Sequence, residues 1–197
     1  VFDAGEYDGL PYLIMEYVDG STLKAVIARE GAMPLDRVRL IAGQMASALD
    51  FMHARGYVHR DIKPSNVMLL PGDHAKLMDF GLVRGTESTH LTRTGMAMGT
   101  PEYMSPEQAM GTETDARADV YAFGVMVYEM VAGSVPFGGG STPAVLFKHV
   151  HEIPRPLEEL LPGLPPGLSL VVGQALAKRP EERYSRAGEL VRDLDMV

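Results

Sequence analysis

The chain has 197 residues, of which 46% are hydrophobic, so it is long enough for one domain with a buried core. Its net charge of −8 and the lack of a long basic run argue against nucleic acid as a partner. No cysteine is present, which excludes disulfides and thiolate metal sites, and no apolar run resembles a membrane span or a signal peptide. We therefore expect a domain suited to a reducing compartment, the cytoplasm.

The amino-terminal stretch predicts two strands joined by a turn. Residues 1–4 and 12–18 are the strands, and the second is apolar on both faces. Residues 5–11 are rich in Gly and Asp and predict the turn. Without further motifs, the simplest interpretation is a buried hairpin that binds no ligand.

Two helices are predicted next. Ser21 or Thr22 is a suitable cap for a short helix that ends at Gly31. Pro34 begins a long helix that Gly56 closes. Apolar residues recur in it at three- and four-residue spacing and form one core-facing stripe: Leu35, Val38, Ile41, Met45, Leu49 and Met52.

Residues 59–66 predict a short loop that carries three polar side chains with different chemical properties. Asp61 can accept a proton, Lys63 can neutralise an anion, and Asn66 can offer an oxygen to a hard cation. Short apolar runs at 67–70 and 75–78 predict a hairpin with Asn66 at one end and Asp79 at the other. Phosphoryl transfer needs this combination of a base, positive charge and oxygen ligands for Mg²⁺.

The remaining chain is predicted to be mostly helical. Residues 82–98 show no periodicity and predict a functional loop. Residues 119–131 are apolar nearly all round, which predicts a buried helix with Asp119 as its cap and Gly133 at its end. Thr142 is expected to cap a helix that reaches His151. A loop at 154–167 and helices at 168–177 and 185–196 complete the prediction.

Three motifs in this order resemble the protein kinase superfamily on its serine/threonine side, in particular the Hanks-type kinases of bacteria. Residues 59–66 are similar to the catalytic loop, 79–81 to the metal-binding turn, and 99–107 to the end of the activation segment. In that last motif Ser105 stands where alanine is commoner. The resemblance implies an α+β, protein kinase-like fold, mostly the α-helical C-lobe with the last two N-lobe strands and the hinge.

The resemblance covers residues 1–197 as a partial protein kinase domain. Residues 1–18 correspond to the end of the N-lobe and the hinge, and residues 19–197 to the C-lobe. The chain contains no G-x-G-x-x-G-x-V loop, no strand lysine of the V-A-I-K type and no partner glutamate on a following helix. We therefore expect an amino-terminally truncated domain that is inactive alone, from a parent that is an active kinase.

By resemblance, the parent transfers the γ-phosphoryl group of ATP to serine or threonine hydroxyls of a protein, with Mg²⁺. Asp61 is the expected catalytic base, and Lys63 is expected at the γ-phosphate. Asn66 and Asp79 are expected to hold Mg²⁺ between them. Met15 falls at the gatekeeper position, and Met68 at the floor under the adenine. The full set of expected ATP contacts is Met15, Glu16, Tyr17, Val18, Lys63, Ser65, Asn66, Met68 and Asp79.

Other positions are implied to be structural. His59 could suggest an acid or base, but the resemblance places it beneath Phe80 in the interior. Thr100 is expected to bond near Asp61 and Lys63. Glu107 and Arg183 are expected to form a buried ion pair, and Asp119 is expected to tie its helix to the catalytic loop.

Arg60 is implied to pair with a phosphorylated residue of the activation loop. Thr92 and Thr94 are the best-placed acceptors, and Ser88 and Thr89 are weaker ones. A phosphate on one of them would order the loop through its charge. The alternative is that these residues are ordinary polar groups of a loop.

Two other functional classes remain open. A pseudokinase or protein-binding module of kinase fold is disfavoured by the intact Asp61, Asn66 and Asp79. A small-molecule phosphotransferase is disfavoured by Lys63 and by residues 99–107, which resemble a peptide-binding platform. The expected partners are a protein substrate and ATP, with no nucleic acid and no membrane segment in this chain. A parent of this type can carry a membrane anchor beyond the kinase domain, and a dimer through the N-lobe is a further expectation.

Overall fold

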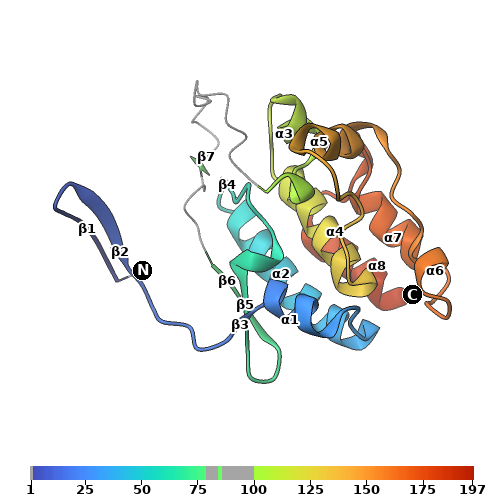
Figure 1. Cartoon of the computed structure of the whole chain (residues 1–197), viewed down its shortest axis with the longest axis horizontal. Helices are drawn as coiled ribbons and strands as arrows, with labels where there is room; N and C mark the ends of the chain where they lie inside the picture. The colour runs from blue at the N-terminus through green and yellow to red at the C-terminus, as the bar shows by residue number, and fades with distance from the viewer. Residues whose placement is uncertain (1, 79–83, 86–99) are drawn as a thin grey trace.

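The computed structural model describes residues 2–78, 84–85 and 100–197 (Figure 1). A small hairpin at the amino terminus projects from a larger, mostly helical body. The strands are β1 (Asp3–Tyr7), β2 (Leu10–Ile14), β3 (Ser21–Thr22), β4 (Tyr57–Val58), β5 (Val67–Leu70), β6 (His74–Leu77) and β7 (Arg84–Gly85). The α-helices are α1 (Leu23–Glu30), α2 (Leu35–His53), α3 (Pro106–Met110), α4 (Arg117–Ala132), α5 (Thr142–His151), α6 (Leu157–Leu160), α7 (Leu168–Ala175) and α8 (Ala187–Met196). Short 3-10 helices are η1 (Pro64–Asn66), η3 (Pro101–Tyr103) and η4 (Pro180–Glu182).

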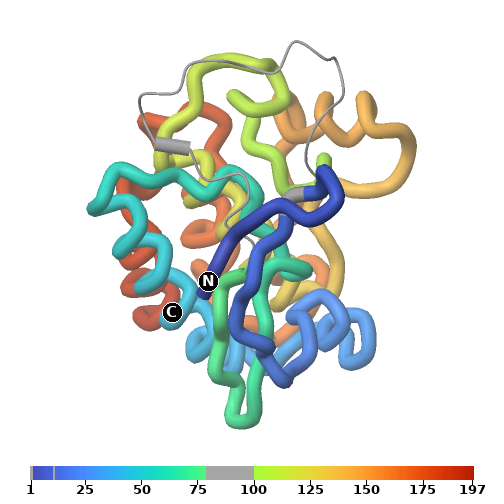
Figure 2. Tube along the Cα trace, turned by 90° about the vertical axis from the view of Figure 1, so that its left-hand side faces the viewer, coloured from blue at the N-terminus to red at the C-terminus, as the bar shows by residue number. Residues whose placement is uncertain are grey.

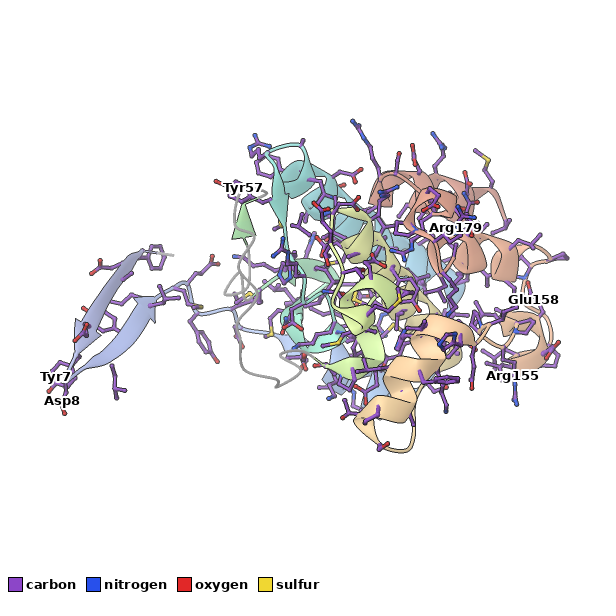
Figure 3. All side chains as sticks on the ribbon, turned by 90° about the horizontal axis from the view of Figure 1, so that it is seen from above. Tyr7, Asp8, Tyr57, Arg155, Glu158 and Arg179 are labelled. Carbon is purple, nitrogen blue, oxygen red and sulfur yellow. The ribbon has the colours of Figure 1, made fainter. Side chains whose placement is uncertain are left out.

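The amino-terminal hairpin differs from its prediction in its turn and in its burial. The turn consists of Asp8 and Gly9 alone, both with positive φ, so the strands extend further into residues 5–11 than expected. Such a two-residue turn matches the twist of the paired strands. Leu13 and Ile14 are 58% and 48% exposed, so the interpretation as a buried hairpin is wrong. Figure 3 shows Tyr7 and Asp8 at the tip, far from the helices.

Two short sheets lie against the helical body. β5 pairs antiparallel with β3 on one side and with β6 on the other, and Met68 lies opposite both Thr22 and Lys76. β4 pairs antiparallel with β7. The predicted hairpin after Asn66 is therefore present. Its turn is fixed from α2, where Arg37 donates to both carboxylate oxygens of Asp73 at 2.8 and 2.9 Å.

The first two helices confirm the predicted caps of α1 and the predicted stripe of α2, whereas α2 ends at His53 with Ala54 as its C-cap, before the Gly56 that was expected to close it. The Thr22 hydroxyl accepts from the Ala25 amide, and Gly31 ends α1 with a positive φ. On α2, the apolar stripe faces the core: Val38, Ile41, Met45 and Leu49 are buried, and Leu35 and Met52 are partly buried against them. In Figure 2 the red α8 lies beside the cyan α2, where Arg39 donates to the Leu194 carbonyl.

Helix α4 is the centre of the core. Thirteen of its residues are buried, as its apolar sequence predicted, and the left-handed Gly133 ends it. Gly124 allows α7 to approach closely, because a Cβ there would lie 2.7 Å from the Cβ of Ala175. The prediction that Asp119 caps this helix is wrong. The N-cap is Ala116, and the Asp119 carboxylate bonds to another segment.

Smaller corrections concern the carboxyl-terminal helices. Ser141 is the N-cap of α5, one residue before the expected Thr142. The loop predicted at 154–167 contains α6, which begins after Pro156. α7 ends two residues earlier than expected, and α8 begins at Ala187, two residues later than expected. Within the described ranges, no helix has the length and apolarity needed to cross a bilayer.

Candidate active site

The loop between β4 and η1 brings three polar side chains together. The Lys63 ammonium lies 2.7 Å from a carboxylate oxygen of Asp61. The Asn66 amide nitrogen donates to the same carboxylate at 3.0 Å and to the Asp61 carbonyl at 2.9 Å. Asp61 and Lys63 remain accessible, with side chains 17% and 18% exposed, whereas Asn66 is buried. A proton acceptor, a cation and an amide therefore lie within hydrogen-bonding reach.

The loop is fixed on its core-facing side by Asp119, a residue of α4. Asp119 is 1% exposed. Its carboxylate accepts from the backbone amides of His59 at 2.8 Å and Arg60 at 2.7 Å. The ring Nε2 of His53 lies 2.8 Å from the same carboxylate. Arg60 has a φ of +68°, which is rare for a residue with a side chain, so these bonds hold a strained conformation.

His59 is fully buried beneath this loop. Its Nδ1 accepts from the Asp61 amide at 3.3 Å, and its Nε2 lies 3.4 Å from the Met78 carbonyl. These contacts place the ring against backbone, where a substrate hydroxyl has no access. The position agrees with a structural role for His59.

A residue that sequence reasoning missed completes the loop. The Gln108 side chain on α3 donates from Nε2 to the Arg60 carbonyl at 3.0 Å. Its Oε1 accepts from the Ser105 amide at 3.0 Å as part of a capping box. The S-x-x-Q pattern at 105–108 could have revealed the cap from sequence. It could not have revealed the contact with Arg60, which lies 48 residues away.

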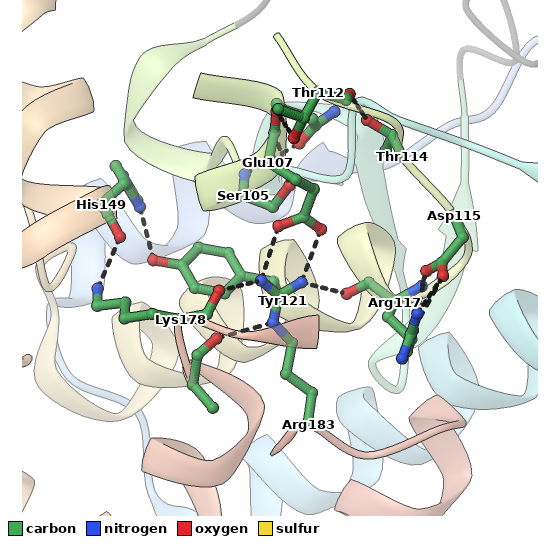
Figure 4. A network of polar contacts seen from close by, with 12 residues as sticks. Ser105, Glu107, Thr112, Thr114, Asp115, Arg117, Tyr121, His149, Lys178 and Arg183 are labelled. Carbon is green, nitrogen blue, oxygen red and sulfur yellow. Dashed lines mark hydrogen bonds and ion pairs between the residues drawn. The ribbon is translucent and has the colours of Figure 1, made fainter. Parts of the chain in front are cut away.

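The end of the predicted activation segment is anchored in the core. Glu107 and Arg183 form a two-pronged ion pair, with both oxygen–nitrogen distances at 2.7 Å (Figure 4). The side chains are 6% and 0% exposed.

A second contact attaches the same segment to the core. Tyr103 donates to Glu129 of α4 at 2.6 Å. Burial and the nearby Glu129 raise the pKa of the Tyr103 phenol, so it stays a neutral donor.

Thr100 and Tyr103 line a small concavity beside Asp61, together with Gln108. Thr100 is half-buried and, at the N-cap of η3, makes no side-chain cap bond.

Of the residues expected around adenine, Met68 lies on β5, and the other four, Met15, Glu16, Tyr17 and Val18, lie in the segment that joins β2 to β3. Glu16 forms an ion pair with Lys76 of β6, and Lys76 lies opposite Met68 in the sheet. This brings the joining segment and Met68 to the same sheet. Of the others, Met15 and Tyr17 are exposed, whereas Val18 and Ser65 are half-buried.

Several predicted residues lie outside the described ranges. They include the proposed metal ligand Asp79, its neighbour Phe80, and the proposed phosphorylation sites Thr92 and Thr94. Asn66 itself fits a place in a Mg²⁺ site, because its amide nitrogen donates to Asp61 and, among the described residues, its amide oxygen contacts only the Ser65 hydroxyl, at 3.5 Å. Within the part of the chain that the structure describes, no cluster of three His, Asp or Glu residues forms a separate metal site.

Comparisons with known proteins agree with this geometry. The family profile described as "Protein kinase domain" matches residues 2–193. The serine/threonine-protein kinase PknB of Mycobacterium leprae is 43% identical over 202 residues, which cover all of this chain and 32% of that protein. PknB of Mycobacterium tuberculosis H37Rv is 42% identical over 203 residues, again all of this chain and 32% of the relative.

A clostridial relative is similar over the same stretch. The probable serine/threonine-protein kinase CPE1738 of Clostridium perfringens is 39% identical over 197 residues, which cover all of this chain and 29% of that protein. The chain thus spans about a third of the length of the curated relatives it matches. It belongs to the protein kinase family, on the side of the bacterial Hanks-type serine/threonine kinases.

Proposed function

We propose that this chain forms the catalytic and substrate-binding part of a protein kinase that transfers the γ-phosphoryl group of ATP to serine or threonine hydroxyls. Residues 1–18 would serve as the end of the N-lobe and the hinge, and residues 19–197 as the C-lobe. One observation carries the proposal: the grouping of Asp61, Lys63 and Asn66 within 3.0 Å on a loop fixed to the core. The domain would act in the cytoplasm, on a protein substrate.

Each side chain has a physical role in this reaction. Asp61 would orient the attacking hydroxyl and accept its proton. Lys63 places a positive charge 2.7 Å from that carboxylate, where negative charge on the transferred group needs compensation. Asn66 would present its amide oxygen to Mg²⁺, with Asp79 as the second protein ligand. A magnesium ion held by these two residues would supply positive charge that offsets the negative charge of the phosphate groups.

The nucleotide base would lie between the joining segment and β5. We propose contacts from the backbone of Glu16, Tyr17 and Val18, with Met15 at the gatekeeper position and Met68 below the ring. Support comes from the Glu16–Lys76 ion pair, because one partner lies in the joining segment and the other lies in the sheet that carries Met68. Ser65 would lie at the phosphate end of the same cleft.

Control by phosphorylation belongs to the same proposal. Arg60 lines a concavity together with Thr100, and its Nε atom is buried without a hydrogen-bond partner among the described residues. A phosphate on Thr92 or Thr94 would supply acceptors for this guanidinium. Mass spectrometry of the active protein should find phosphate on one of the two, and its absence from both would contradict this part of the proposal.

Asp61→Asn in the full-length protein tests the proposed base. The substitution keeps the shape of the side chain and leaves an oxygen for Asn66, but it removes the carboxylate. We expect turnover to fall about 10²–10⁴-fold while ATP affinity stays nearly unchanged. Asp36→Asn is the matched control, because the Asp36 side chain is 96% exposed on α2. Unchanged turnover in Asp61→Asn would exclude Asp61 as the base.

A further inference from the structure

The peptide group between Arg60 and Asp61 is held at both of its ends, because the Asp61 amide donates to His59 Nδ1 at 3.3 Å and the Arg60 carbonyl accepts from a side chain of α3. The Arg60 amide, which belongs to the preceding peptide group, donates to Asp119 at 2.7 Å. The Arg60 carbonyl accepts from Gln108 at 3.0 Å. The Asp61 carboxylate follows directly on the chain, so its direction depends on the plane of this peptide group.

The bonds from the core side hold only backbone amides. Asp119 accepts from the Arg60 amide at 2.7 Å and His59 Nδ1 accepts from the Asp61 amide at a longer 3.3 Å, whereas the Arg60 carbonyl is held from the side of α3 by Gln108. With a φ of +68°, Arg60 lies in a region that most side-chain-bearing residues avoid, so rotation toward ordinary values would relieve strain. The bond from Gln108 opposes that rotation, because it fixes the carbonyl.

Gln108 is well placed to hold its position. It lies next to Glu107, whose ion pair with Arg183 anchors α3 in the core. Its amide oxygen accepts from the Ser105 amide, and its amide nitrogen donates to the Arg60 carbonyl of the catalytic loop. The capping box needs only the oxygen of Gln108 and the Ser105 hydroxyl, so the bond to Arg60 is a separate contact.

We propose that Gln108 is a positioning residue for Asp61, through which the anchored end of the activation segment sets the geometry of the catalytic loop. The inference rests on the proposed kinase function and adds a residue to it. Gln108 also lines the concavity beside Asp61 with Thr100 and Tyr103. The contact therefore couples the surface that receives the substrate to the group that accepts its proton.

Gln108→Glu in the full-length protein isolates the contact. The new carboxylate keeps an oxygen for the Ser105 amide but turns a second oxygen, in place of a donor, toward the Arg60 carbonyl. We expect kcat to fall about 10–100-fold, as for a small misplacement of a catalytic group, with KM for ATP within about twofold. Ser105→Ala is the matched control. It removes the 3.4 Å cap bond and leaves both Gln108 contacts, so kcat should stay within about twofold.

Hydrogen exchange of a peptide that covers residues 57–63 provides a readout that does not depend on activity. Exchange should be faster in Gln108→Glu than in the unsubstituted protein and unchanged in Ser105→Ala. Gln108→Met, which adds no charge, serves the same test if thermal unfolding shows that Gln108→Glu is not folded. The proposal is overturned if both kcat and exchange in the Gln108 variant match those of the unsubstituted protein, or if Ser105→Ala causes equal losses. If the unsubstituted protein transfers no phosphoryl group, the proposed function fails, and the exchange data still decide the role of Gln108.

Discussion

Removal of the guanidinium of Arg183 should destabilise the domain more than any change to a surface ion pair. Its side chain is fully buried and meets both oxygens of Glu107 at 2.7 Å. It also donates to the carbonyls of Ala177 at 2.8 Å and of Lys178 and Arg117 at 3.1 Å. Arg183→Met would leave a buried carboxylate without its cation and three carbonyls without this donor.

The size of the effect follows from the loss of charge compensation. A buried charge left without its partner costs about 3–5 kcal/mol. In a domain of this length each kcal/mol shifts Tm by about 2–4 °C, so Arg183→Met should lower Tm by roughly 6–20 °C. Glu107→Gln should cost less, about 1.5–3 kcal/mol, because the glutamine oxygen still accepts from Arg183 and the three carbonyls keep their bonds.

Urea unfolding followed by circular dichroism would give the free energy of unfolding of each variant. Arg179→Met is the matched control, since that side chain is 69% exposed and pairs with Glu181 at the surface. It should change the stability by at most about 1 kcal/mol. The reasoning is wrong if Arg183→Met costs less than about 1 kcal/mol or no more than Arg179→Met. A larger cost for Glu107→Gln than for Arg183→Met would also contradict it.

Two further predictions concern His149 and Arg37. Burial lowers the pKa of His149 to about 4, so below pH 6.5 the unfolded state binds more protons, and acidification to pH 5 should cost about 2 kcal/mol of stability. This loss of stability should vanish in His149→Gln and persist in His151→Gln, which changes the exposed side of α5. The free energy of unfolding, measured as a function of pH, tests this prediction, and an equal dependence on pH in both variants would refute it. Arg37→Ala should lower the free energy of unfolding by about 1–2 kcal/mol through its bonds to Asp73, whereas Arg29→Ala, at an exposed pair, should cost under about 0.5 kcal/mol. Equal effects in urea unfolding would show that the turn does not depend on Arg37.

The helices could be predicted from sequence because their signals are local. Thr22 and Gly31 bound α1 as expected, and the period of the α2 stripe gave its buried face. The exposure of Leu13 could not be predicted, because an apolar strand is buried only if another element covers it. The composition of the strand itself does not indicate whether such an element covers it.

The site was predictable only where its residues are close in sequence. Asp61, Lys63 and Asn66 share one loop, so their proximity follows from spacing alone. The contact of Asp119 with that loop followed from the resemblance, whereas its position in the helix suggested a cap. Gln108 was missed because a contact across 48 residues depends on the tertiary arrangement of α3, which no local pattern encodes.

The bonding of the catalytic loop to α4 has a consequence for how variants of this protein are read. A random mutagenesis screen scored by activity should recover positions along α4 as often as positions in the loop. At Gly124, for example, any side chain would press against Ala175 of α7 and displace the helix that carries Asp119. Such a variant would look like an active-site variant in the screen although it lies in the core. Cellular abundance, scored beside activity, would separate the two classes, because a core variant loses protein and a loop variant loses only turnover.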